Sequence, residues 1–472
     1  MSARVLLLSI NRCADPEPVF PLALSHLSAA LTQAGHATEW LDLQAETRPW
    51  PTIVEAYKPD FVGVSVRNLD DILIGRQQTF YDELGSICGQ IRLVTPAPLI
   101  LGGSGFSIFP LELLERAGAD FGIIGEGEAS LVHLIRALQE GTDYRSIDGL
   151  VYRTGGQIAA NPPRSCRLGA LPSACDPPPG LVAHYVHSTG TLNVQTQRGC
   201  GHHCCYCTYP VIEGRQHRHR DGDDVAAELE RLTRLGARYI FIVDSVFNSF
   251  PGHVVDICEA ILRRGLQLRW SCFLRPVGLT SDLMALMAKA GLAHIEFGSD
   301  SFCDQVLDAY QKDLTFDDIL AASEHASRAG LPYCHFLVCG GPGETPETVR
   351  QSFANFSRLP NPIALAVAGM RIYPGTSLAR RARKDGVIQA DTDLLRPAYY
   401  LAPGLTVAGI RKQLQDFAGE NPNWVTGESV PTLTSLSARL RQRKVTGPLW
   451  QFYPTLQRLW PGSSDVSFVQ HR

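Results

Sequence analysis

A tight cluster of cysteines is the feature of this sequence that most constrains its fold and chemistry. Cys200, Cys204 and Cys207 form a CxxxCxxC motif directly after an expected strand at Leu192–Thr196. Iron–sulfur clusters are held by cysteine thiolates, normally four of them. Three thiolates from one short loop leave one iron without a protein ligand, and an open coordination position is where a small molecule binds in catalytic metal sites. The motif therefore favours a [4Fe–4S] cluster with one open iron.

Zinc and disulfide bonds are the alternative interpretations of these cysteines. His202, His203 and Cys205 lie in the same loop and could supply zinc ligands. Zinc sites usually combine two separated half-sites, and the downstream sequence has no second one. The chain has 13 cysteines, an odd number, and most stand singly in apolar segments, which is typical of buried reduced thiols. A zinc site stays open as the second interpretation.

Size and composition predict a globular protein of roughly two to three domains. The chain has 472 residues, of which 44% are hydrophobic and 19% charged, and its net charge is −4. This charge balance gives no electrostatic basis for binding nucleic acid. The apolar run Val5–Leu8 is too short for a signal peptide or a membrane span, and no later run reaches membrane length. We expect a cytoplasmic protein.

The first 140 residues predict a parallel, doubly wound sheet, because short apolar runs alternate with helical patterns. Ligands bind such sheets at the carboxyl ends of the strands, where glycine lets a ligand approach the backbone. The glycine run at 102–105 is not the GxGxxG fingerprint, which argues against NAD. The candidate ligand-binding residues at these strand ends are Asn11, Ser65, Arg67, Asn68, Gly102, Gly103, Ser104, Gly105, Gly125, Glu126 and Gly127.

A second run of strands and helices begins after a hairpin pattern at 149–158 and a proline-rich linker. Its six expected strands are 192–196, 239–243, 268–274, 294–298, 333–338 and 367–372. In parallel barrels the chemistry lies at the carboxyl ends of the strands. Any one polar residue there could be a helix cap or a turn residue, but their repetition at six strand ends indicates a site. The candidate site residues, at the second to the fifth of these strands, are Asp244, Ser245, Arg275, Glu296, Gly298, Gly341 and Gly343.

With aromatic Tyr206 directly before its last cysteine, the loop resembles that of the radical S-adenosylmethionine (SAM) superfamily. In that family three cysteines hold a [4Fe–4S] cluster, SAM binds the open iron, and reduction splits SAM to a 5′-deoxyadenosyl radical. The resemblance implies a partial (β/α)6 barrel in which Asp244 and Ser245 contact the SAM amino group and Arg275 its carboxylate. It also implies that Tyr206, Glu296, Gly298, Gly341 and Gly343 bind SAM, and that Cys205 is a bystander.

The first domain resembles the cobalamin (B12)-binding domain that precedes many radical SAM domains. The resemblance rests on Pro21–Leu27 and on the glycine runs at 102–105 and 125–128, and it makes cobalamin the ligand of the strand-end residues named above. The DxHxxG motif that supplies a cobalt-ligating histidine is absent, so cobalamin would be held without that ligand. His26 and His36 lie in or beside an amphipathic helical pattern, where packing or solvation is the expected role.

Together these resemblances imply an α/β protein with four parts. They are a Rossmann-like B12-binding domain (1–144), a hairpin and proline-rich linker (145–190), a radical SAM barrel (191–380) and a mainly helical C-terminal extension (381–472). The strings Ser65–Asp71, Gln195–Cys200 and Tyr206–Pro210 are closest to members associated with lipid biosynthesis.

The implied activity is cobalamin-dependent methyl transfer to an unactivated carbon, after the radical has abstracted a hydrogen atom. The resemblance also implies a small-molecule or lipid-type substrate and an electron donor such as flavodoxin or ferredoxin. Radical cyclisation, rearrangement or oxidation without methyl transfer is the first alternative, and a non-catalytic sensor of cobalamin and a cluster is the second. No catalytic general base is identified in the sequence.

Two basic segments have several interpretations. Arg215, Arg218 and Arg220 follow the cysteine loop and could orient the domains, neutralise ligand phosphates or form a solvated face. Near the end, basic residues precede aromatic ones, a pattern that fits a membrane interface but more often a helix end that contacts the core, which we expect here. The residues of this second segment are Arg439, Arg441, Arg443, Lys444, Leu449, Trp450, Phe452, Tyr453, Leu459 and Trp460.

Overall fold

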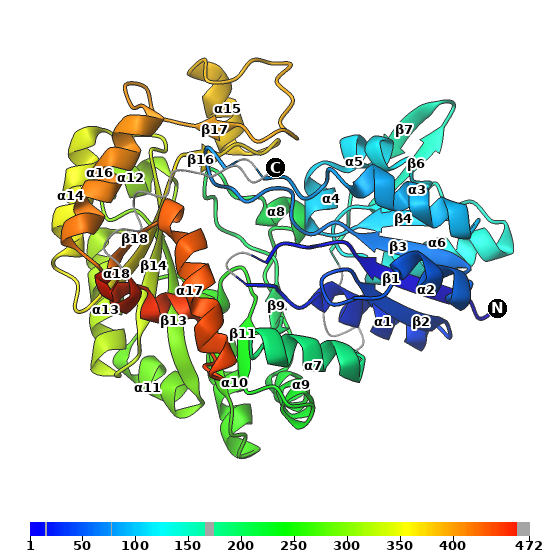
Figure 1. Ribbon diagram of the computed structural model, residues 1–472, viewed down its shortest axis with the longest axis horizontal. Coiled ribbons are helices and arrows are strands. Elements are labelled where there is room, and N and C mark those ends of the chain that lie inside the picture. Colours follow the sequence, from blue (N-terminus) through cyan, green and yellow to red (C-terminus); the bar gives the residue numbers. More distant parts are fainter. Residues whose placement is uncertain (15–16, 77, 166–173, 460–472) are drawn as a thin grey trace.

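The protein is built on two seven-stranded sheets that lie side by side, each flanked by helices (Figure 1). The computed structural model describes residues 1–14, 17–76, 78–165 and 174–459. Trp460 and the rest of the extension to residue 472 lie outside the described residues, as does part of the predicted linker. The α/β class is confirmed, with a doubly wound sheet in the first part of the chain and a second parallel sheet after it.

The first sheet has the strand order β2-β1-β3-β4-β5-β6-β7, and its first five strands are parallel. Its order reverses between β1 and β3, the position at which open α/β sheets bind ligands. The hairpin expected in the linker is β6–β7, which adds two antiparallel strands to this sheet. The strands are β1 (Arg4–Ser9), β2 (Ala37–Asp42), β3 (Phe61–Ser65), β4 (Leu99–Gly102), β5 (Phe121–Ile123), β6 (Leu150–Thr154) and β7 (Gln157–Ala160).

Strand β1 explains why this sheet is covered on both faces. Val5 and Leu7 pack into a core with α1 (Leu22–Gln33) and α6 (Glu128–Glu140). Leu6 and Leu8 point to the opposite face and join a separate core, because successive strand residues alternate between faces. That second face is covered by α2 (Trp50–Tyr57), α3 (Leu84–Val94) and α5 (Pro110–Ala117). Continuous apolar runs are typical of strands buried on both sides.

The second sheet is wholly parallel, with the order β18-β15-β14-β13-β12-β11-β8. Five of the six expected strands are present, and the C-terminal extension contributes β18, which the sequence analysis missed. The strand expected at 367–372 is displaced. β15 begins at Ile363 and ends at Ala368, before Gly369, which adopts a φ of 79°. Met370–Arg371 forms the separate strand β16, which pairs with β17 (Tyr399–Tyr400). The strands are β8 (Thr191–Val194), β11 (Tyr239–Ile242), β12 (Arg269–Leu274), β13 (Leu292–Asp300), β14 (Tyr333–Cys339), β15 (Ile363–Ala368) and β18 (Trp424–Thr426).

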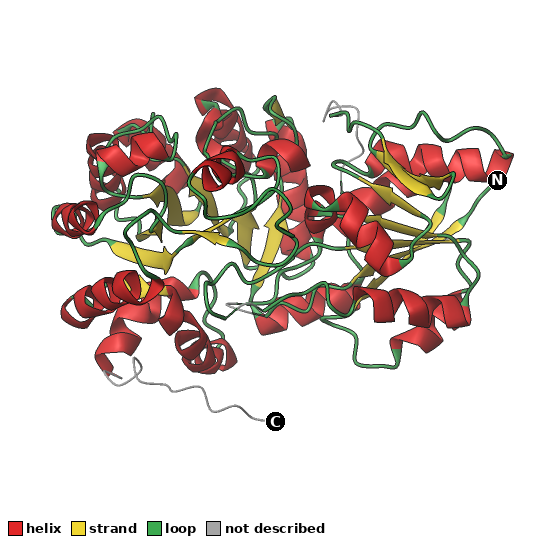
Figure 2. Ribbon diagram, turned by 90° about the horizontal axis from the view of Figure 1, so that it is seen from above, coloured by secondary structure: helices red, strands yellow, loops and turns green. Residues whose placement is uncertain are grey.

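Helices cover the outer face of this second sheet (Figure 2). Side-chain caps fix several helix starts: Asp221 accepts from the Asp223 and Asp224 amides at the start of α9, and Thr315 forms a capping box at α13. The helices of this region are α9 (Gly222–Arg234), α10 (Pro251–Arg263), α11 (Ser281–Lys289), α12 (Asp304–Ala309), α13 (Phe316–Arg328), α14 (Pro346–Phe356), α15 (Ser377–Lys384), α16 (Val407–Glu420), α17 (Val430–Gln442) and α18 (Tyr453–Leu459).

The two domains face each other through the carboxyl ends of their strands. The segment after β3 reaches the end of β15, where Ile74 lies against Gly369. Arg371 of β16 donates to the Asp70 carboxylate at 2.9 Å. At the other side, α7 (Pro179–Ser188) places the Tyr185 hydroxyl 2.7 Å from the carboxylate of Asp42 at the end of β2. Among the described residues, no helix is both long and apolar enough to span a bilayer.

Candidate functional site at the domain junction

The cysteine loop is held in place from both sides. Its entry strand β9 (Gln197–Arg198) pairs with β10 (Arg218–His219), and the Cys200 amide donates to the Gly214 carbonyl at 3.1 Å. On the opposite side, the Cys205 amide donates to the Tyr310 carbonyl at 2.9 Å. The loop therefore spans the space between a hairpin and the end of α12, with its conformation fixed by backbone hydrogen bonds.

The three motif thiols gather in one partly enclosed place. Cys200 is buried, Cys204 and Cys207 are half-buried, and none is in a disulfide. Burial, reinforced by the neighbouring thiolates, raises the pKa of Cys204 and raises that of Cys207 to about 12. Such thiolates are costly without a positive partner, so this donor set fits a cationic iron–sulfur core. In the described part of the chain, no three Cys, His, Asp or Glu side chains are grouped to hold a single metal ion.

Cys205 lies apart from this donor set. Its side chain is 5% exposed and packs in the hydrophobic core that also contains Tyr310 and Leu378. Burial raises the pKa of its thiol to about 12. Its backbone is used instead, because the Cys205 carbonyl accepts from the Leu378 amide at 2.8 Å. This packing supports the interpretation of Cys205 as a bystander.

Asp244, predicted to contact the SAM amino group, is fully buried at the end of β11 and braces the start of the cysteine loop. Its Oδ1 accepts from the Thr196 amide at 2.7 Å and from the Gln197 amide at 3.2 Å. Its Oδ2 accepts from the Thr196 hydroxyl at 2.5 Å. Desolvation raises the pKa of Asp244 to about 7, against these hydrogen bonds. Neighbouring Ser245 donates to the Gly199 carbonyl at 3.1 Å, so both residues position the loop, and their contact with SAM stays a prediction.

Tyr206 and Arg275 converge on a buried ion pair beside the loop. The Tyr206 hydroxyl donates to Asp300 Oδ2 at 2.5 Å, and Lys312 Nζ lies 2.5 Å from the same oxygen. The Arg275 guanidinium donates to the carbonyls of Lys312 and Asp313. Sequence reasoning missed Lys312, because it lies on the turn after α12, with no motif around it and far from the cysteines in the chain.

The remaining predicted SAM residues differ in what surrounds them. Glu296 is buried on β13 and accepts from Trp450 Nε1 at 3.0 Å, and desolvation raises its pKa to about 7. Two residues further on, a side chain added at Gly298 would meet open space, which leaves room for a ligand. Gly341 and Gly343 instead pack against Tyr310 and Ala309, so close packing already explains why both are glycine.

The glycine run after β4 forms a tight cradle against the segment that follows β3. Gly103 has a φ of 101°, and a Cβ there would lie 2.6 Å from the Val66 carbonyl oxygen. Gly105 donates its amide to the same carbonyl at 3.0 Å, and the Ser104 hydroxyl donates to the Arg67 carbonyl at 3.0 Å. The cradle fits a large ligand, because glycine leaves the backbone accessible in a loop at the carboxyl end of a strand. This loop lies beside the point between β1 and β3 at which the strand order reverses.

Polar side chains around this cradle also indicate a ligand-binding site. The buried Asn11 carries a side-chain oxygen with no hydrogen-bond partner among the described residues. Arg67 is exposed, yet desolvation lowers the pKa of its guanidinium, and its titratable neighbours include Tyr209 from the cysteine-loop side. Arg67 therefore lies near residues of both domains. Ser65, Asn68 and Gly102 lie at the same strand ends, and their contact with cobalamin stays a prediction.

The loop after β5 connects the two sites. Glu126 binds the guanidinium of Arg218, with one N–O distance of 2.9 Å. Arg198 donates to Glu128 at 2.6 Å, and despite burial it lowers the pKa of Glu128 to about 2. Gly125 lies against the carbonyl of Ile212, the last residue of α8 (Tyr209–Ile212), and Gly127 precedes α6 and packs against Leu27. These ion pairs tie the glycine loop to the cysteine hairpin.

These contacts decide between the earlier interpretations of the basic segment after the loop. Arg218 orients the domains through Glu126, and Arg220 pairs with Asp224 and Glu228 within its own domain. Arg215 is exposed. The two histidines of the first helical pattern pack, as expected: the His36 Nδ1 accepts from the Ala3 amide at 3.1 Å, and burial lowers the pKa of His26 to about 3.

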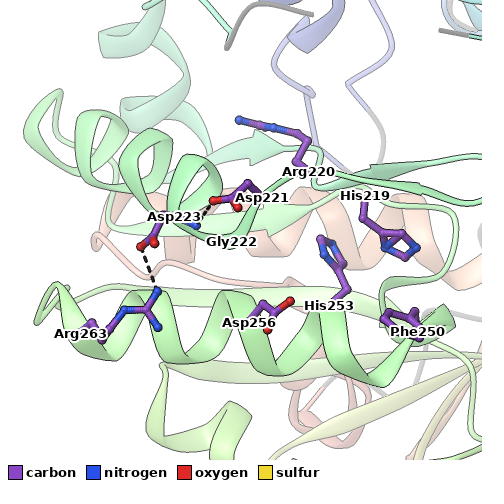
Figure 3. Close-up of a pocket in the computed structure, with 9 residues that line it drawn as sticks. All are labelled: His219, Arg220, Asp221, Gly222, Asp223, Phe250, His253, Asp256 and Arg263. Carbon is purple, nitrogen blue, oxygen red and sulfur yellow. Dashed lines mark hydrogen bonds and ion pairs between the residues drawn. The ribbon is translucent and has the colours of Figure 1, made fainter. Parts of the chain in front are cut away.

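A surface cavity of about 450 Å³ lies where β10, α9 and α10 meet (Figure 3). Figure 3 shows Asp223 and Arg263 paired at its rim, at a distance of 3.0 Å. On the inner side, His253 Nε2 lies 2.9 Å from the Thr196 hydroxyl that donates to Asp244. Of the described residues that line this cavity, none was predicted to bind SAM or cobalamin.

In the C-terminal segment, Trp450 and Tyr453 are buried in a hydrophobic core, whereas Leu459 is exposed. Trp450 is 5% exposed and bonds to Glu296, while Gln451 Oε1 lies 2.7 Å from His294 Nε2. Arg441 forms two hydrogen bonds with Glu17 of the first domain, at 2.5 and 2.6 Å. The prediction of a helix end with an aromatic core contact is thus confirmed for Trp450, and Arg441 serves as a link between the domains.

Two family models match the chain. The Radical SAM superfamily model matches residues 194–354 and the B12 binding domain model matches residues 15–135. The B12 binding domain match contains the glycine cradle at Gly102–Gly105, and the radical SAM match contains the cysteine loop. The cofactors expected from the sequence, and the fold, are therefore confirmed.

Similar proteins cover most of the chain. Tryptophan 2-C-methyltransferase of Streptomyces laurentii is 27% identical over 78% of this chain and 73% of its own length. Hopanoid C-3 methylase of Methylococcus capsulatus is 24% identical over 77% of this chain and 70% of its own. The structure of the radical SAM methyltransferase TsrM from Kitasatospora setae, with cobalamin and a [4Fe–4S] cluster bound, superposes with a TM-score of 0.83 at 25% identity, covering 99% of this chain and 100% of that one. The hopanoid methylase gives loose support to a relation with lipid-type members.

Proposed function

Because the chain is a radical SAM enzyme with an N-terminal B12 binding domain, we propose that it methylates an unactivated carbon of a small molecule, with SAM as the methyl source. The observation that carries this proposal is the tie between Glu126 and Arg218, which holds the glycine loops of the first domain beside the cysteine hairpin of the second. Methyl transfer by two cofactors needs their sites in one shared space.

The cofactor sites follow from the donor groups described above. Cys200, Cys204 and Cys207 would hold the [4Fe–4S] cluster, and the cradle at Gly102–Gly105 with Arg67 would hold cobalamin. When bound, the cluster supplies the electron that activates SAM, and cobalamin supplies a carrier for the methyl group. We assign SAM to the space above Gly298, between the cysteine loop and the strand ends that carry Ser245, Arg275 and Glu296.

The chain's own residues bind, orient and enclose the reactants. Asp244 and Thr196 fix the loop entry, so the thiols are positioned before any cofactor binds. The shared core around Met370, Tyr400 and Phe109 keeps the junction dry, and exclusion of water protects reactive species. An external one-electron donor of the flavodoxin or ferredoxin class completes the proposal.

The substrate is proposed as either a polar small molecule or a lipid, because the similar proteins include methyltransferases for both kinds. The test uses the reconstituted holoenzyme, a reductant and SAM with a deuterated methyl group. One arm contains an aqueous metabolite extract of the source cells and the other a lipid extract. A deuteromethylated product together with S-adenosylhomocysteine supports the proposal, and the arm in which it forms identifies the substrate class.

The same experiment separates the alternatives. Formation of 5′-deoxyadenosine without S-adenosylhomocysteine and without a labelled product, in either arm, means that the enzyme performs radical chemistry without methyl transfer. Absence of both nucleoside products from a fully loaded protein means that it is a binding protein. The Cys204→Ala variant is the negative control, and the Cys205→Ala variant is the matched control.

A further inference from the structure

The ion pair between Lys312 and Asp300 is buried and lies beside the cysteine loop. The side chains of both residues are 8% exposed, and their charged atoms are 2.5 Å apart. A buried ion pair is weak evidence for stability, because desolvation offsets most of the attraction. A role in the site is therefore the better explanation for keeping it.

One hydrogen bond connects the pair to the cysteine loop. Tyr206, which lies between Cys204 and Cys207 in the motif, donates its hydroxyl to the same Asp300 oxygen that faces Lys312. On the other side, Arg275 donates to the carbonyls of Lys312 and Asp313. The guanidinium of Arg275 therefore fixes the backbone of Lys312. The Asp300 carboxylate, which is hydrogen-bonded to Tyr206 of the cysteine loop, fixes the side chain of Lys312.

The backbone around the pair is held in costly conformations. Asp300, Gln311 and Asp313 have φ values of 64°, 59° and 47°. They are three of the seven non-glycine residues with positive φ in the described part of the chain. Such strain persists only where the surrounding structure enforces it, and it concentrates at functional sites. Here it places the Lys312 ammonium next to the loop.

We propose that Lys312, held by Asp300, is a positioning residue for charge: it places a buried cation beside the cysteine loop and thereby raises the reduction potential of the cluster. A cluster held by thiolates becomes more negative by one charge on reduction, and a nearby cation in a low dielectric favours the more negative state. The proposal rests on the cluster ligands assigned under the proposed function, but not on methyl transfer.

The test is an EPR-monitored redox titration of the reconstituted holoenzyme without SAM, after iron and sulfide content have been matched between variants. Lys312→Met removes the charge but keeps the length of the side chain. It is expected to weaken the preference for the reduced cluster at least tenfold, which corresponds to about 59 mV for a one-electron couple. Lys312→Arg keeps the charge and is expected to stay within about threefold of the wild type.

A second variant gives the opposite sign. Asp300→Asn leaves the cation unneutralised and is expected to strengthen the preference for the reduced cluster. If the Lys312→Met protein fails to bind the cluster, the Asp300→Asn variant still tests the proposal, because this variant retains the Lys312 cation. The matched control is Lys412→Met, which breaks a Lys–Asp pair whose side chains are 74% and 64% exposed, and it leaves the potential unchanged.

Two results would overturn the proposal. One is an unchanged potential in a fully loaded Lys312→Met protein, including the case in which only its affinity for SAM falls. The other is a shift of the same sign in Lys312→Met and Asp300→Asn, which indicates a general disturbance of the loop. Neither result depends on whether a methyl group is transferred, so failure here is distinct from failure of the proposed function.

Discussion

Arg371 and Asp70 are 301 residues apart in the chain, yet the guanidinium of one donates to the carboxylate of the other at 2.9 Å. Their side chains are 4% and 0% exposed. The same guanidinium donates to the carbonyls of Ile372 and Leu394, so its hydrogen-bonding capacity is used in a dry environment. This pair connects the segment after β3 to the end of the second sheet.

Removal of the Asp70 carboxylate is expected to destabilise the protein strongly. Asp70→Ala leaves Arg371 charged, buried and without its carboxylate, which costs about 3–5 kcal/mol of unfolding free energy. Urea denaturation followed by fluorescence measures the loss. The surface variant Asp416→Ala, which breaks an exposed pair with Lys412, should lose at most about 1 kcal/mol. Equal losses in the two variants would contradict the importance of this contact.

Cluster binding is expected to depend on Cys204 but not on its neighbour in the sequence. Cys204→Ala removes one of three thiolates and should lose most of the bound iron and the visible absorbance of the cluster. Cys205→Ala removes a thiol that packs in the core, so iron content should stay at the wild-type level. Iron and sulfide analysis after anaerobic reconstitution measures both. A Cys205→Ala protein without a cluster would make this thiol a ligand and refute the assignment.

Gly103 is expected to control cobalamin binding through the shape of its backbone. A side chain at this position is strained by the left-handed φ and collides with the Val66 carbonyl, so Gly103→Ala should retain at least about tenfold less cobalamin after desalting. Gly156 has a similar φ of 80° but no atom within 4 Å of an added Cβ. Gly156→Ala therefore shares only the conformational cost, roughly 1 kcal/mol, and should bind cobalamin normally.

Stability is expected to fall as pH rises from about 4 to about 7, partly because of Glu296. Burial raises the folded-state pKa of Glu296 to about 7, whereas an unfolded glutamate ionises near pH 4.3. Within this window unfolding releases a proton, so the stabilisation present at low pH is lost as pH rises through the folded pKa. The contribution of this carboxyl is roughly 4 kcal/mol.

Glu296→Gln tests this dependence, because glutamine cannot ionise but still accepts from Trp450. Its unfolding free energy should match that of the wild type near pH 4 and exceed it above pH 7, as measured by urea denaturation at several pH values. Glu420→Gln changes an exposed residue of the same type and should leave the pH profile unaltered. Parallel profiles for wild type and Glu296→Gln would show that Glu296 is ionised in the folded protein.

Local patterns made most of the fold and part of the site predictable. The CxxxCxxC motif and the polar residues at strand ends are encoded within a few positions, so the cysteine loop and the glycine cradle could be located from the sequence. Strand β18 was missed because its three residues are too few for a periodic pattern. Lys312 was missed for a different reason, as were the pairings of Trp450 with Glu296 and of Arg218 with Glu126. These contacts are made by residues far apart in the chain, and single-sequence patterns carry no information on such pairs.

One hydrophobic core is shared between residues that the ribosome makes at very different times. Leu84 and Phe109 of the first domain are buried against the same cluster as Tyr310, Met370 and Tyr400. Helices α2, α3 and α5 cover most of this face, but the part that packs against the second domain stays open during synthesis until those later residues have emerged. The nascent chain therefore carries an exposed apolar surface through part of its synthesis, when chaperones would protect it.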